Sequence, residues 1–369
     1  MRASPARDSR AESWSDGGEF DTTRPMKTIA WYITPHGYGH GARSTDLMRT
    51  VADRRPDIAL VVCTTLPESF LSGRLAGLNY TRRPVALDVG MVQADSVRVN
   101  LEETQQKLRG LLDTWDDQVA REGEWLKEAG IDGVVADIPG IALQAARDAG
   151  LTSVAIGNFG WDWIYEDFVE ADGESSVWND AVGRCRKAYS AASLLLRLPF
   201  SEPMSAFPKQ RCVPLVAHPG QEQRQAVAAR TGANPDSLWI LLSFTTLEWN
   251  AEARARVAAI PGVEWFTIEP LQWPEPGFHQ IARDEMSVSD LFATVDAVLT
   301  KPGYGVLSDC TVNNKPIIHV EREDFREYPI LRSAVEAHMA SVFLPAEKLY
   351  AGDLAEAVNE VREIGPAPR

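Results

Sequence analysis

The sequence lacks the features that define several large classes of protein. Its four cysteines are widely scattered and none forms a C-x-x-C pair, so neither a zinc site nor a disulfide framework is indicated. No apolar run is long enough to cross a bilayer, and the first residues contain no signal-peptide apolar region. We therefore expect reduced thiols, a cytoplasmic location and no insertion into a membrane.

Positive charge is also scarce. The 37 Lys and Arg residues stand against 52 Asp and Glu, which gives a net charge of -15. A chain this acidic repels nucleic acid except at a local basic patch, so no nucleic-acid partner is expected. With 369 residues and 44% hydrophobic composition, the chain can bury a large core, and its length favours about two domains.

Residues 1–25 contain almost nothing apolar and are rich in Ser, Asp, Glu, Arg and Gly, which predicts a flexible leader. Beyond it, short apolar runs alternate with helical patterns. The first series has expected strands at 28–34, 58–64, 133–137 and 152–157 and expected helices at 43–53 and 141–149. This alternation predicts parallel strands joined by right-handed crossovers.

Prolines become frequent between residues 199 and 219, which predicts a break in regular structure and a linker at 211–222. A second series then has expected strands at 238–244, 263–268, 295–299 and 316–320 and expected helices at 251–260, 288–293 and 304–312. We therefore expect an α/β protein in which two Rossmann-like βαβ domains face each other across a cleft. Their expected bounds are 26–210 and 223–350, followed by a C-terminal helix and tail at 351–369.

Two glycine-rich turns each follow an expected strand. The first is His36-Gly37-Tyr38-Gly39-His40-Gly41, and the second is Lys301-Pro302-Gly303-Tyr304-Gly305. In a parallel α/β sheet, such turns present backbone N–H groups to an anion at the start of the next helix. Both turns are therefore candidate anion-binding sites.

Neither a dinucleotide nor a metal ion is expected at the first turn. Its glycines do not have the G-x-G-x-x-G spacing, and Thr64 and Thr65 stand where an acid would bind the ribose of NAD. His36 and His40 are conceivable metal ligands, but no third ligand cluster lies near them in the sequence. The chain also has no Asp-x-Asp pair of the kind that metal-dependent transferases use to bind a diphosphate. We expect no cofactor and no bound metal.

Several stretches of the sequence carry a resemblance to a known family. These stretches are residues 36–43, 87–95, 158–165, 197–199 and 301–305. Together they resemble the N-terminal, glycosyltransferase-like half of the L-arabinokinases, and more distantly the layout is similar to the GT-B superfamily. The kinase half has no counterpart here, so sugar phosphorylation is not implied. The resemblance implies a GT-B fold and an inverting, metal-independent transfer from a nucleoside diphosphate sugar, a UDP-sugar first, to a small-molecule acceptor.

The resemblance implies a catalytic role for two residues. His40 matches the histidine that deprotonates the acceptor in GT-B enzymes, and Asp137 matches the aspartate that orients it. The chemistry is sensible because imidazole titrates near neutrality and a carboxylate partner raises its basicity and fixes its tautomer. A structural alternative is that His40 satisfies the loop backbone or caps the next helix, while Asp137 caps the helix that starts near Pro139.

The donor is expected to bind to the second domain. The amides of the second turn and the Lys301 ammonium would hold the diphosphate. The resemblance to GT-B enzymes implies that Asp309 binds the ribose, that the turn starting at Ser243 binds the β-phosphate and that the acidic loop after residue 320 binds the sugar. The candidate donor residues are Ser243, Thr245, Lys301, Gly303, Tyr304, Gly305, Asp309, Glu323 and Asp324. Each assignment has a structural alternative. Asp309 can be a solvated acid on a helix, the turn starting at Ser243 an ordinary polar turn, and the acidic loop a solvated charged loop.

The acceptor is expected to bind to the first domain. Aromatic rings stack on sugars or heterocycles and exclude water, and a carboxylate can bind a hydroxyl or an amine. The candidate acceptor residues are His36, Tyr38, Trp161 and Asp162. The tryptophans of residues 158–165 can equally be core aromatics that anchor the loop.

Two other functions fit the same sequence. One is a nucleotide-sugar epimerase or hydrolase on the same fold, in which His40 handles a sugar proton or a water molecule. The other is a non-catalytic module that binds a nucleotide sugar. The sequence identifies neither the base, the sugar, the acceptor nor the oligomeric state.

Overall fold

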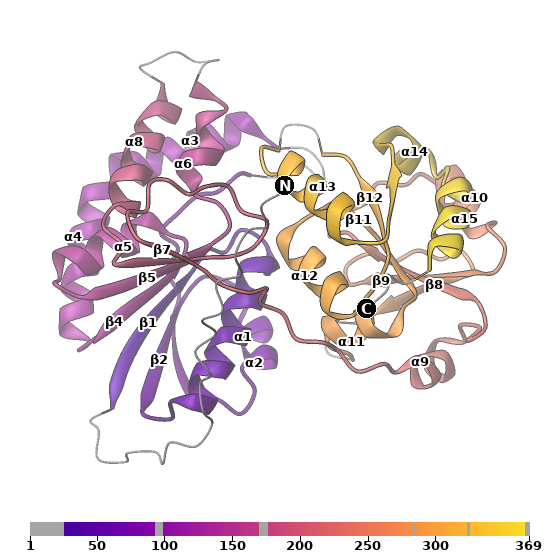
Figure 1. Cartoon of the computed structure of the whole chain (residues 1–369), viewed down its shortest axis with the longest axis horizontal. Coiled ribbons are helices and arrows are strands. Elements are labelled where there is room, and N and C mark those ends of the chain that lie inside the picture. The colour runs from indigo at the N-terminus through magenta and orange to yellow at the C-terminus, as the bar shows by residue number, and fades with distance from the viewer. Residues whose placement is uncertain (1–25, 93–98, 170–175, 283–284, 323–324, 366–369) are drawn as a thin grey trace, which may run out of the picture.

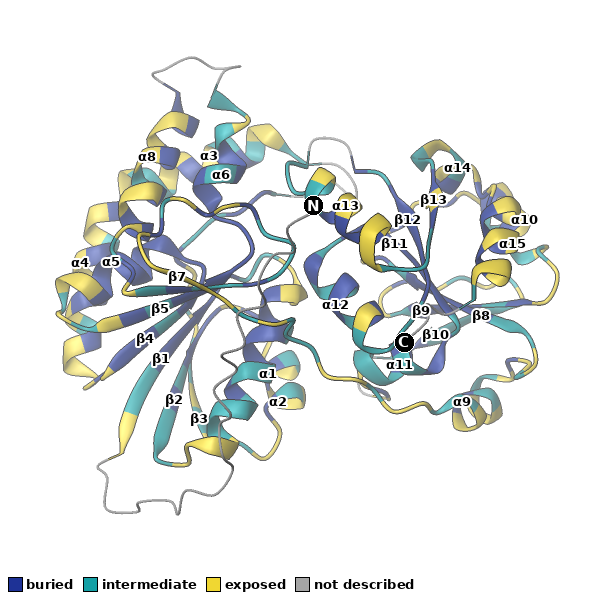
Figure 2. Cartoon of the chain, in the orientation of Figure 1, coloured by how far each residue is buried: buried dark blue, intermediate teal, exposed yellow. Residues whose placement is uncertain are grey.

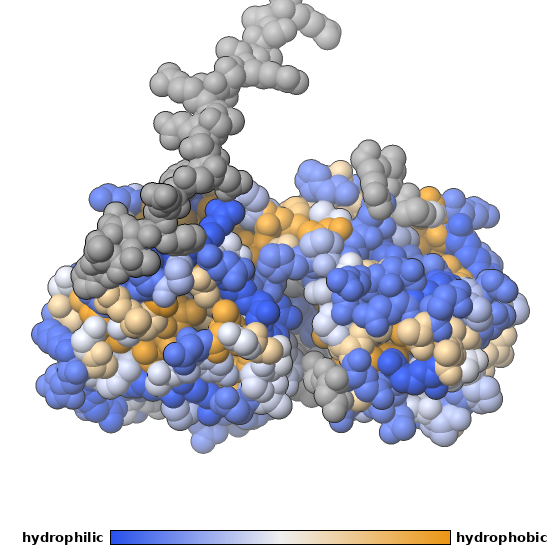
Figure 3. Space-filling view, turned by 90° about the horizontal axis from the view of Figure 1, so that it is seen from below, coloured by the Kyte–Doolittle hydropathy of each residue, from blue (hydrophilic) through white to orange (hydrophobic). Residues whose placement is uncertain are grey.

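The computed structural model describes residues 26–92, 99–169, 176–282, 285–322 and 325–365. These residues form two parallel β-sheets, each flanked by helices, in two lobes that lie side by side (Figure 1). The helices turn exposed faces outward while the central strands are largely buried (Figure 2). In the space-filling view the lobes are separated by a furrow (Figure 3).

Within the described residues, the first sheet has seven strands in the order β3-β2-β1-β4-β5-β6-β7, all paired in parallel. The strands are β1 (Lys27–Ile33), β2 (Ile58–Cys63), β3 (Tyr80–Arg83), β4 (Gly133–Asp137), β5 (Thr152–Gly157), β6 (Leu194–Arg197) and β7 (Gln210–Cys212). The chain reverses direction along the sheet between β3 and β4, which makes β1 and β4 neighbours and brings their carboxyl ends together. Ligands of open α/β sheets bind at such a switch point.

Helices cover both faces of the first sheet. They are α1 (Tyr38–Arg54), α2 (Glu68–Arg74), α3 (Leu101–Asp113), α4 (Trp115–Glu128), α5 (Gly140–Asp148), α6 (Trp161–Glu166) and α8 (Val177–Tyr189). α5 is buried from Gly140 to Ala146 because this part is apolar except for Gln144 and packs between the sheet and α4 and α8. This rigid packing fixes the loop between β4 and α5, which carries Asp137 at its start.

The second sheet is six-stranded in the part of the chain that is described, with the order β10-β9-β8-β11-β12-β13 and parallel pairing throughout. Its strands are β8 (Leu238–Ser243), β9 (Val263–Ile268), β10 (Phe278–Ile281), β11 (Ala297–Thr300), β12 (Ile317–Val320) and β13 (Ser341–Leu344). Its helices are α9 (Arg224–Thr231), α10 (Ala251–Ala258), α11 (Val288–Thr294), α12 (Tyr304–Val312), α13 (Tyr328–His338), α14 (Ala346–Ala351) and α15 (Ala355–Ile364). The two doubly wound sheets confirm the expected α/β architecture.

The first lobe contacts the second through the helices that follow the two glycine-rich turns. α1 and α12 pack against each other between the sheets (Figure 1). Tyr304, in the first turn of α12, is 8% exposed and joins a core cluster formed by Trp31, Ile33 and Met48 of the other lobe. The two turns therefore lie at one interface and not on separate surfaces.

The described helices include none whose length and apolar character would let it span a bilayer.

Candidate active site

His40 and Asp137 form a buried pair at the carboxyl ends of β1 and β4. Ile33 pairs with Asp137 in the sheet register, and the Thr34 N–H donates to the Asp137 carbonyl at 2.9 Å. α1 begins at Tyr38 directly after Gly37, whose φ of 87° is open to glycine, so His40 falls in the first turn of the helix. Its Nδ1 lies 2.7 Å from Asp137 Oδ1.

Arg43 lies one turn further along α1 and binds the same carboxylate. Its Nε donates to Asp137 Oδ2 at 2.7 Å and its Nη2 to Oδ1 at 2.5 Å, and the Ser44 hydroxyl donates to Oδ2 at 3.0 Å. Asp137 has no exposed surface. Burial by itself would raise the pKa of Asp137, but Arg43 and His40 outweigh it and hold that pKa well below its usual range. Asp137 is therefore an ionised carboxylate with every lone-pair direction occupied.

This arrangement determines which nitrogen of His40 carries the proton. Two lone pairs 2.7 Å apart would repel, so a proton must lie between Nδ1 and Oδ1. Because Arg43 keeps Asp137 ionised, that proton belongs to Nδ1, and Nε2 keeps its lone pair. Burial first, and the charge of Arg43 second, lower the pKa of His40 against the opposing effects of Asp137 and Asp88. His40 is thus held as a neutral imidazole whose Nε2 keeps its lone pair, which is the form that a general base needs.

The network continues from Arg43 into the second lobe. Arg43 Nη1 donates to Asn158 Oδ1 at 2.9 Å, and Asn158 Nδ2 donates to Glu327 Oε1 at 3.2 Å. Asn158 follows β5 directly, whereas Glu327 precedes α13 on the other sheet. The Arg43 guanidinium also lies over the Tyr304 ring, 5.2 Å from its centroid. Arg43 therefore contacts residues of both lobes.

The second glycine turn faces the first. Gly303 ends the β11 loop and is the N-cap of α12, and a Cβ built on Gly305 would lie 3.5 Å from the Gly39 Cα. Lys301 is half-buried at the end of β11. The amide dipoles at the start of α12 thus lie beside the turn that carries His40, where they could hold an anion, and Lys301 begins the second glycine turn.

The other predicted donor residues fall at the same edge of the second sheet or outside the described part of the chain. Ser243 ends β8 beside Thr300, whose hydroxyl donates to the Ser243 carbonyl at 2.9 Å, while Thr245 is exposed. Asp309 lies on α12 opposite Arg74 and Asp46 of the first lobe. Burial raises its pKa to about 7, with Arg74 lowering it and Asp46 raising it further. Glu323 and Asp324 lie outside the described residues.

A wall of aromatic rings adjoins His40. The Phe159 ring lies 5.8 Å from the His40 ring and 5.0 Å from the Trp161 ring, which in turn meets His36 edge-on at 5.8 Å. Trp161 Nε1 donates to Asp88 Oδ2 at 3.0 Å, and Asp88 Oδ1 lies 3.5 Å from His36 Nε2. A second histidine–carboxylate pair therefore stands next to the first.

Two of the predicted acceptor residues point elsewhere. The Asp162 carboxylate turns toward α8, where it lies 3.5 Å from Arg186 Nε, and burial raises its pKa. Tyr38 is 36% exposed and its ring packs on Phe70 at 4.9 Å. His36 and Trp161 are thus brought together beside His40, but Asp162 and Tyr38 are not part of that wall.

Six residues of the site were not predicted, namely Arg43, Ser44, Asp88, Asn158, Phe159 and Glu327. Asp88, Arg43 and Asn158 all stand in the stretches that carry the family resemblance, and the spacing of three between His40 and Arg43 is that of neighbours on one helix face. Glu327 lies in a charged run that had been interpreted only through Glu323 and Asp324, so nothing local distinguished it.

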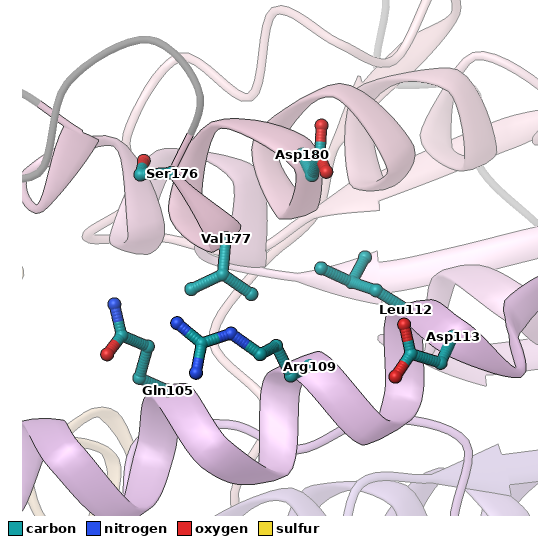
Figure 4. Close-up of a pocket in the computed structure, with 7 residues that line it drawn as sticks. All are labelled: Gln105, Arg109, Leu112, Asp113, Ser176, Val177 and Asp180. Atoms are coloured by element: carbon teal, nitrogen blue, oxygen red, sulfur yellow. The ribbon is translucent and has the colours of Figure 1, made fainter.

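Two open cavities lie away from this site. One, of about 480 Å³, lies between α3 and α8, where Gln105 and Arg109 extend toward Val177 (Figure 4). The other, of about 700 Å³, is lined by residues such as Gly220 and Lys315 of the second lobe. Neither is lined by His40 or Asp137. Among the residues described, no group of three or more His, Cys, Asp or Glu side chains is placed to hold a metal ion.

Comparison with solved structures decides the fold. A UDP-glucosyltransferase from Polygonum tinctorium, capable of glucosylating indoxyl, has 12% sequence identity and a TM-score of 0.63, with 93% of this chain and 92% of that chain covered. The chain has the GT-B glycosyltransferase fold. Arabidopsis thaliana UGT89C1, complexed with quercetin, has 14% identity, a TM-score of 0.62 and coverage of 91% and 90%. Phytolacca americana UGT2, complexed with UDP-2-fluoro-glucose and pterostilbene, has 13% identity, a TM-score of 0.59 and coverage of 92% and 94%.

Sequence comparison finds a relative that matches most of this GT-B chain. L-arabinokinase of Arabidopsis thaliana is 31% identical over 344 residues, which cover 92% of this chain. The chain spans about a third of the length of that relative, since the match covers 32% of it. No family model matches. The similarity confirms the resemblance stated from the motifs and leaves the activity of this GT-B chain to be proposed.

Proposed function

We propose that the protein transfers a sugar from a nucleoside diphosphate sugar to a hydroxyl-bearing small-molecule acceptor, with inversion and without a metal ion. UDP is the proposed nucleotide because the structural neighbours are UDP-sugar glycosyltransferases and one of them is complexed with UDP-2-fluoro-glucose. The observation that carries the proposal is the buried His40–Asp137 pair, 2.7 Å apart, facing the glycine turn that opens α12.

His40 would act as the general base. As the acceptor oxygen forms a bond to the anomeric carbon, its proton moves to His40 Nε2, and the bond between that carbon and the diphosphate oxygen breaks with its electron pair leaving on the diphosphate. Attack from the face opposite the leaving group inverts the anomeric configuration. Asp137 holds Nδ1 and stabilises the imidazolium that forms.

The charge that develops on the diphosphate would be met by groups of the second lobe. The first amides of α12, from Gly303 onward, carry the positive end of the helix dipole, and Lys301 supplies a compact cation beside them. Donors that are already in place stabilise a leaving group without reorganisation at the moment of reaction. The acceptor would lie against Phe159, Trp161 and His36, next to His40.

The test is an assay of UDP-sugars against a panel of phenolic and sugar acceptors, with products identified by mass spectrometry. NMR of the product then gives the configuration of the anomeric carbon. An acceptor-linked sugar of inverted configuration supports the proposal, and a retained configuration contradicts its mechanism. Conversion of the donor without any acceptor indicates an epimerase or hydrolase instead. A rise in melting temperature with UDP but no turnover of any donor indicates a binding module.

A further inference from the structure

Arg43 connects the catalytic pair of one lobe to the surface of the other. Three of its nitrogens are engaged: Nε and Nη2 on Asp137, and Nη1 on Asn158. Asn158 in turn donates to Glu327 of the second lobe. Arg43 is 4% exposed, so its own bonds to Asp137 and Asn158 are shielded from bulk water, whereas the Asn158–Glu327 bond is only partly buried. An arginine with this many fixed bonds has one orientation. In this series of hydrogen bonds, Glu327 is the residue that belongs to the second lobe.

We propose that Arg43 is a positioning residue that keeps the base nitrogen of His40 free, and that Glu327, acting through Asn158, holds Arg43 in this role only while the lobes are closed. The inference rests on the proposed function, in which His40 is the base. It assigns Glu327 to control of the first lobe's chemistry rather than to contact with the donor sugar.

The reason for Arg43 lies in the chemistry of the carboxylate. A buried Asp–His pair without a further cation stabilises the imidazolium, and a histidine that is already protonated cannot accept a proton from the acceptor. Arg43 satisfies the charge of Asp137 and opposes protonation of the neighbouring ring, because its Nη2 lies 2.9 Å from His40 Nδ1. Asp137 can therefore orient the His40 ring without causing the ring to take up a second proton.

The reason for Glu327 lies in its place between two arginines. Burial raises the pKa of Glu327 above its usual value, while Arg322 on the β12–α13 loop and Arg43 across the interface oppose that rise. Opening of the lobes would break the Asn158–Glu327 bond and remove the Tyr304 ring from Arg43. Arg43 would then be free to leave Asp137 for water. Closure thus completes the base only when the second lobe, with its donor, is in place.

Among the residues that the structure describes, few charged groups surround His40. Arg43 lies on its own helix, Asp137 faces it from the end of β4, and Asp88 faces it from the loop after β3. Across the interface, Tyr304 of α12 and the Glu327 carboxylate face Arg43. A titration of His40 therefore reports chiefly on Arg43, Asp137 and Asp88.

The experiment is an NMR titration of ¹⁵N-histidine-labelled protein without substrate. The chemical shifts of the ring nitrogens give the pKa and the tautomer of His40. The His40 signals are assigned by their absence from the spectrum of the His40→Gln protein. We expect the native protein to hold the Nδ1–H tautomer and to titrate below pH 6.5. Arg43→Met should raise the pKa of His40 by about one unit or more, that is, by a tenfold change in proton affinity. Arg43→Lys, which keeps the charge, should leave it near the native value.

The role of Glu327 is tested by turnover. Glu327→Ala should lower kcat and move the acidic limb of the pH–kcat profile to higher pH. Glu327→Gln, whose amide oxygen can still accept from Asn158, should retain most of the native kcat. Asn158→Ala should match Glu327→Ala, and the double variant should be no worse than either single variant. Glu336→Gln, on the exposed face of α13, is the matched control. Additive effects that fall on the KM of the donor would assign Glu327 to the sugar and overturn its proposed role.

The two proposals fail separately. If Arg43→Met leaves the His40 titration unchanged in a protein that still unfolds cooperatively, the inference is wrong even where His40 proves to be the base. If the Arg43→Met protein does not fold, the pKa of His40 is measured in the Arg43→Lys and Asn158→Ala proteins instead. A large change of that pKa in Arg43→Lys, which keeps the charge, overturns the electrostatic role of Arg43. If no transfer is found while the titration behaves as expected, the proposed function fails and the role of Arg43 toward His40 remains.

Discussion

The backbones of Gly39 and Gly305, which belong to different lobes, approach so closely that a Cβ on Gly305 would lie 3.5 Å from the Gly39 Cα. That distance is ordinary van der Waals contact, so an alanine fits, and we expect a branched side chain to press on the Gly39 turn. The glycine turns of the first and second series, far apart in the sequence, thus form one junction. Because the two glycines are in contact, a side chain introduced at position 305 is expected to move α12 relative to His40.

Gly305→Leu should therefore separate the lobes and lower turnover by one to two orders of magnitude, about the loss that slight misplacement of a catalytic group causes. Gly305→Ala should retain most activity. Steady-state kinetics at saturating donor would measure both. Gly183→Ala, on the exposed face of α8, where the added Cβ meets nothing within 4 Å, is the control for loss of a glycine as such. Equal activity of the Leu and native proteins would show that the junction does not govern the reaction.

The pH dependence of kcat/KM should reflect a base with a lowered pKa. Burial and then Arg43 lower the pKa of His40 below 6.5, so Nε2 is unprotonated throughout the neutral range. The rate should stay level above about pH 7 and fall only as the pH drops below 6.5. Stability should decline in the same direction, because the unfolded chain takes up a proton that the folded one does not. A rate that falls with an apparent pKa above 7 would contradict this.

Arg43→Met should also destabilise the fold. It leaves the fully buried Asp137 carboxylate without its bidentate partner, and loss of one member of a buried pair typically costs roughly 3–5 kcal/mol. Urea unfolding measures the change. Arg332→Met breaks an exposed pair with Glu336 on α13 and should cost far less, because solvent screens that pair. Similar costs for the two variants would mean that the Arg43–Asp137 pair carries no special weight.

Asp88→Asn should weaken acceptor binding. The asparagine can still accept from Trp161 Nε1 but loses the charge that faces His36 at 3.5 Å, so His36 loses its orienting partner. The KM of the acceptor should rise several-fold while the affinity for UDP, measured by calorimetry, stays unchanged. Asp162→Asn, on the α8 side, should alter the acceptor KM little. The opposite ranking of the two variants would restore Asp162 as the acceptor residue.

Much of the sheet architecture was predictable from the sequence. The expected strands at 133–137, 152–157 and 263–268 match β4, β5 and β9 residue for residue, because each is a short apolar run with abrupt polar or glycine boundaries. The helix expected from residue 43 begins at Tyr38 instead. Glycines normally oppose helix, but the first turn of a helix has no internal N–H bonds to lose, and there they are tolerated.

The site was only partly predictable. The pairing of His40 with Asp137 followed from the family resemblance and from two loops at adjoining strand ends. The Arg43 bonds to Asp137 and Asn158 depend on side-chain directions across three elements, which periodicity does not specify. Glu327 belongs to a charged run whose solvated and interface residues look alike in sequence. Asp162 was chosen for its type beside Trp161, but successive residues of a helix point in different directions.

The most direct test of His40 as the base is turnover by His40→Ala at saturating UDP-sugar and acceptor, with UDP affinity measured calorimetrically on the same samples. General bases typically contribute about 10²–10⁴-fold to a rate, so we expect a loss in that range with UDP binding unchanged. His338→Gln, an exposed histidine on α13, should be fully active. A His40→Ala protein that turns over at the native rate would show that the His40–Asp137 pair is structural and that the base is elsewhere.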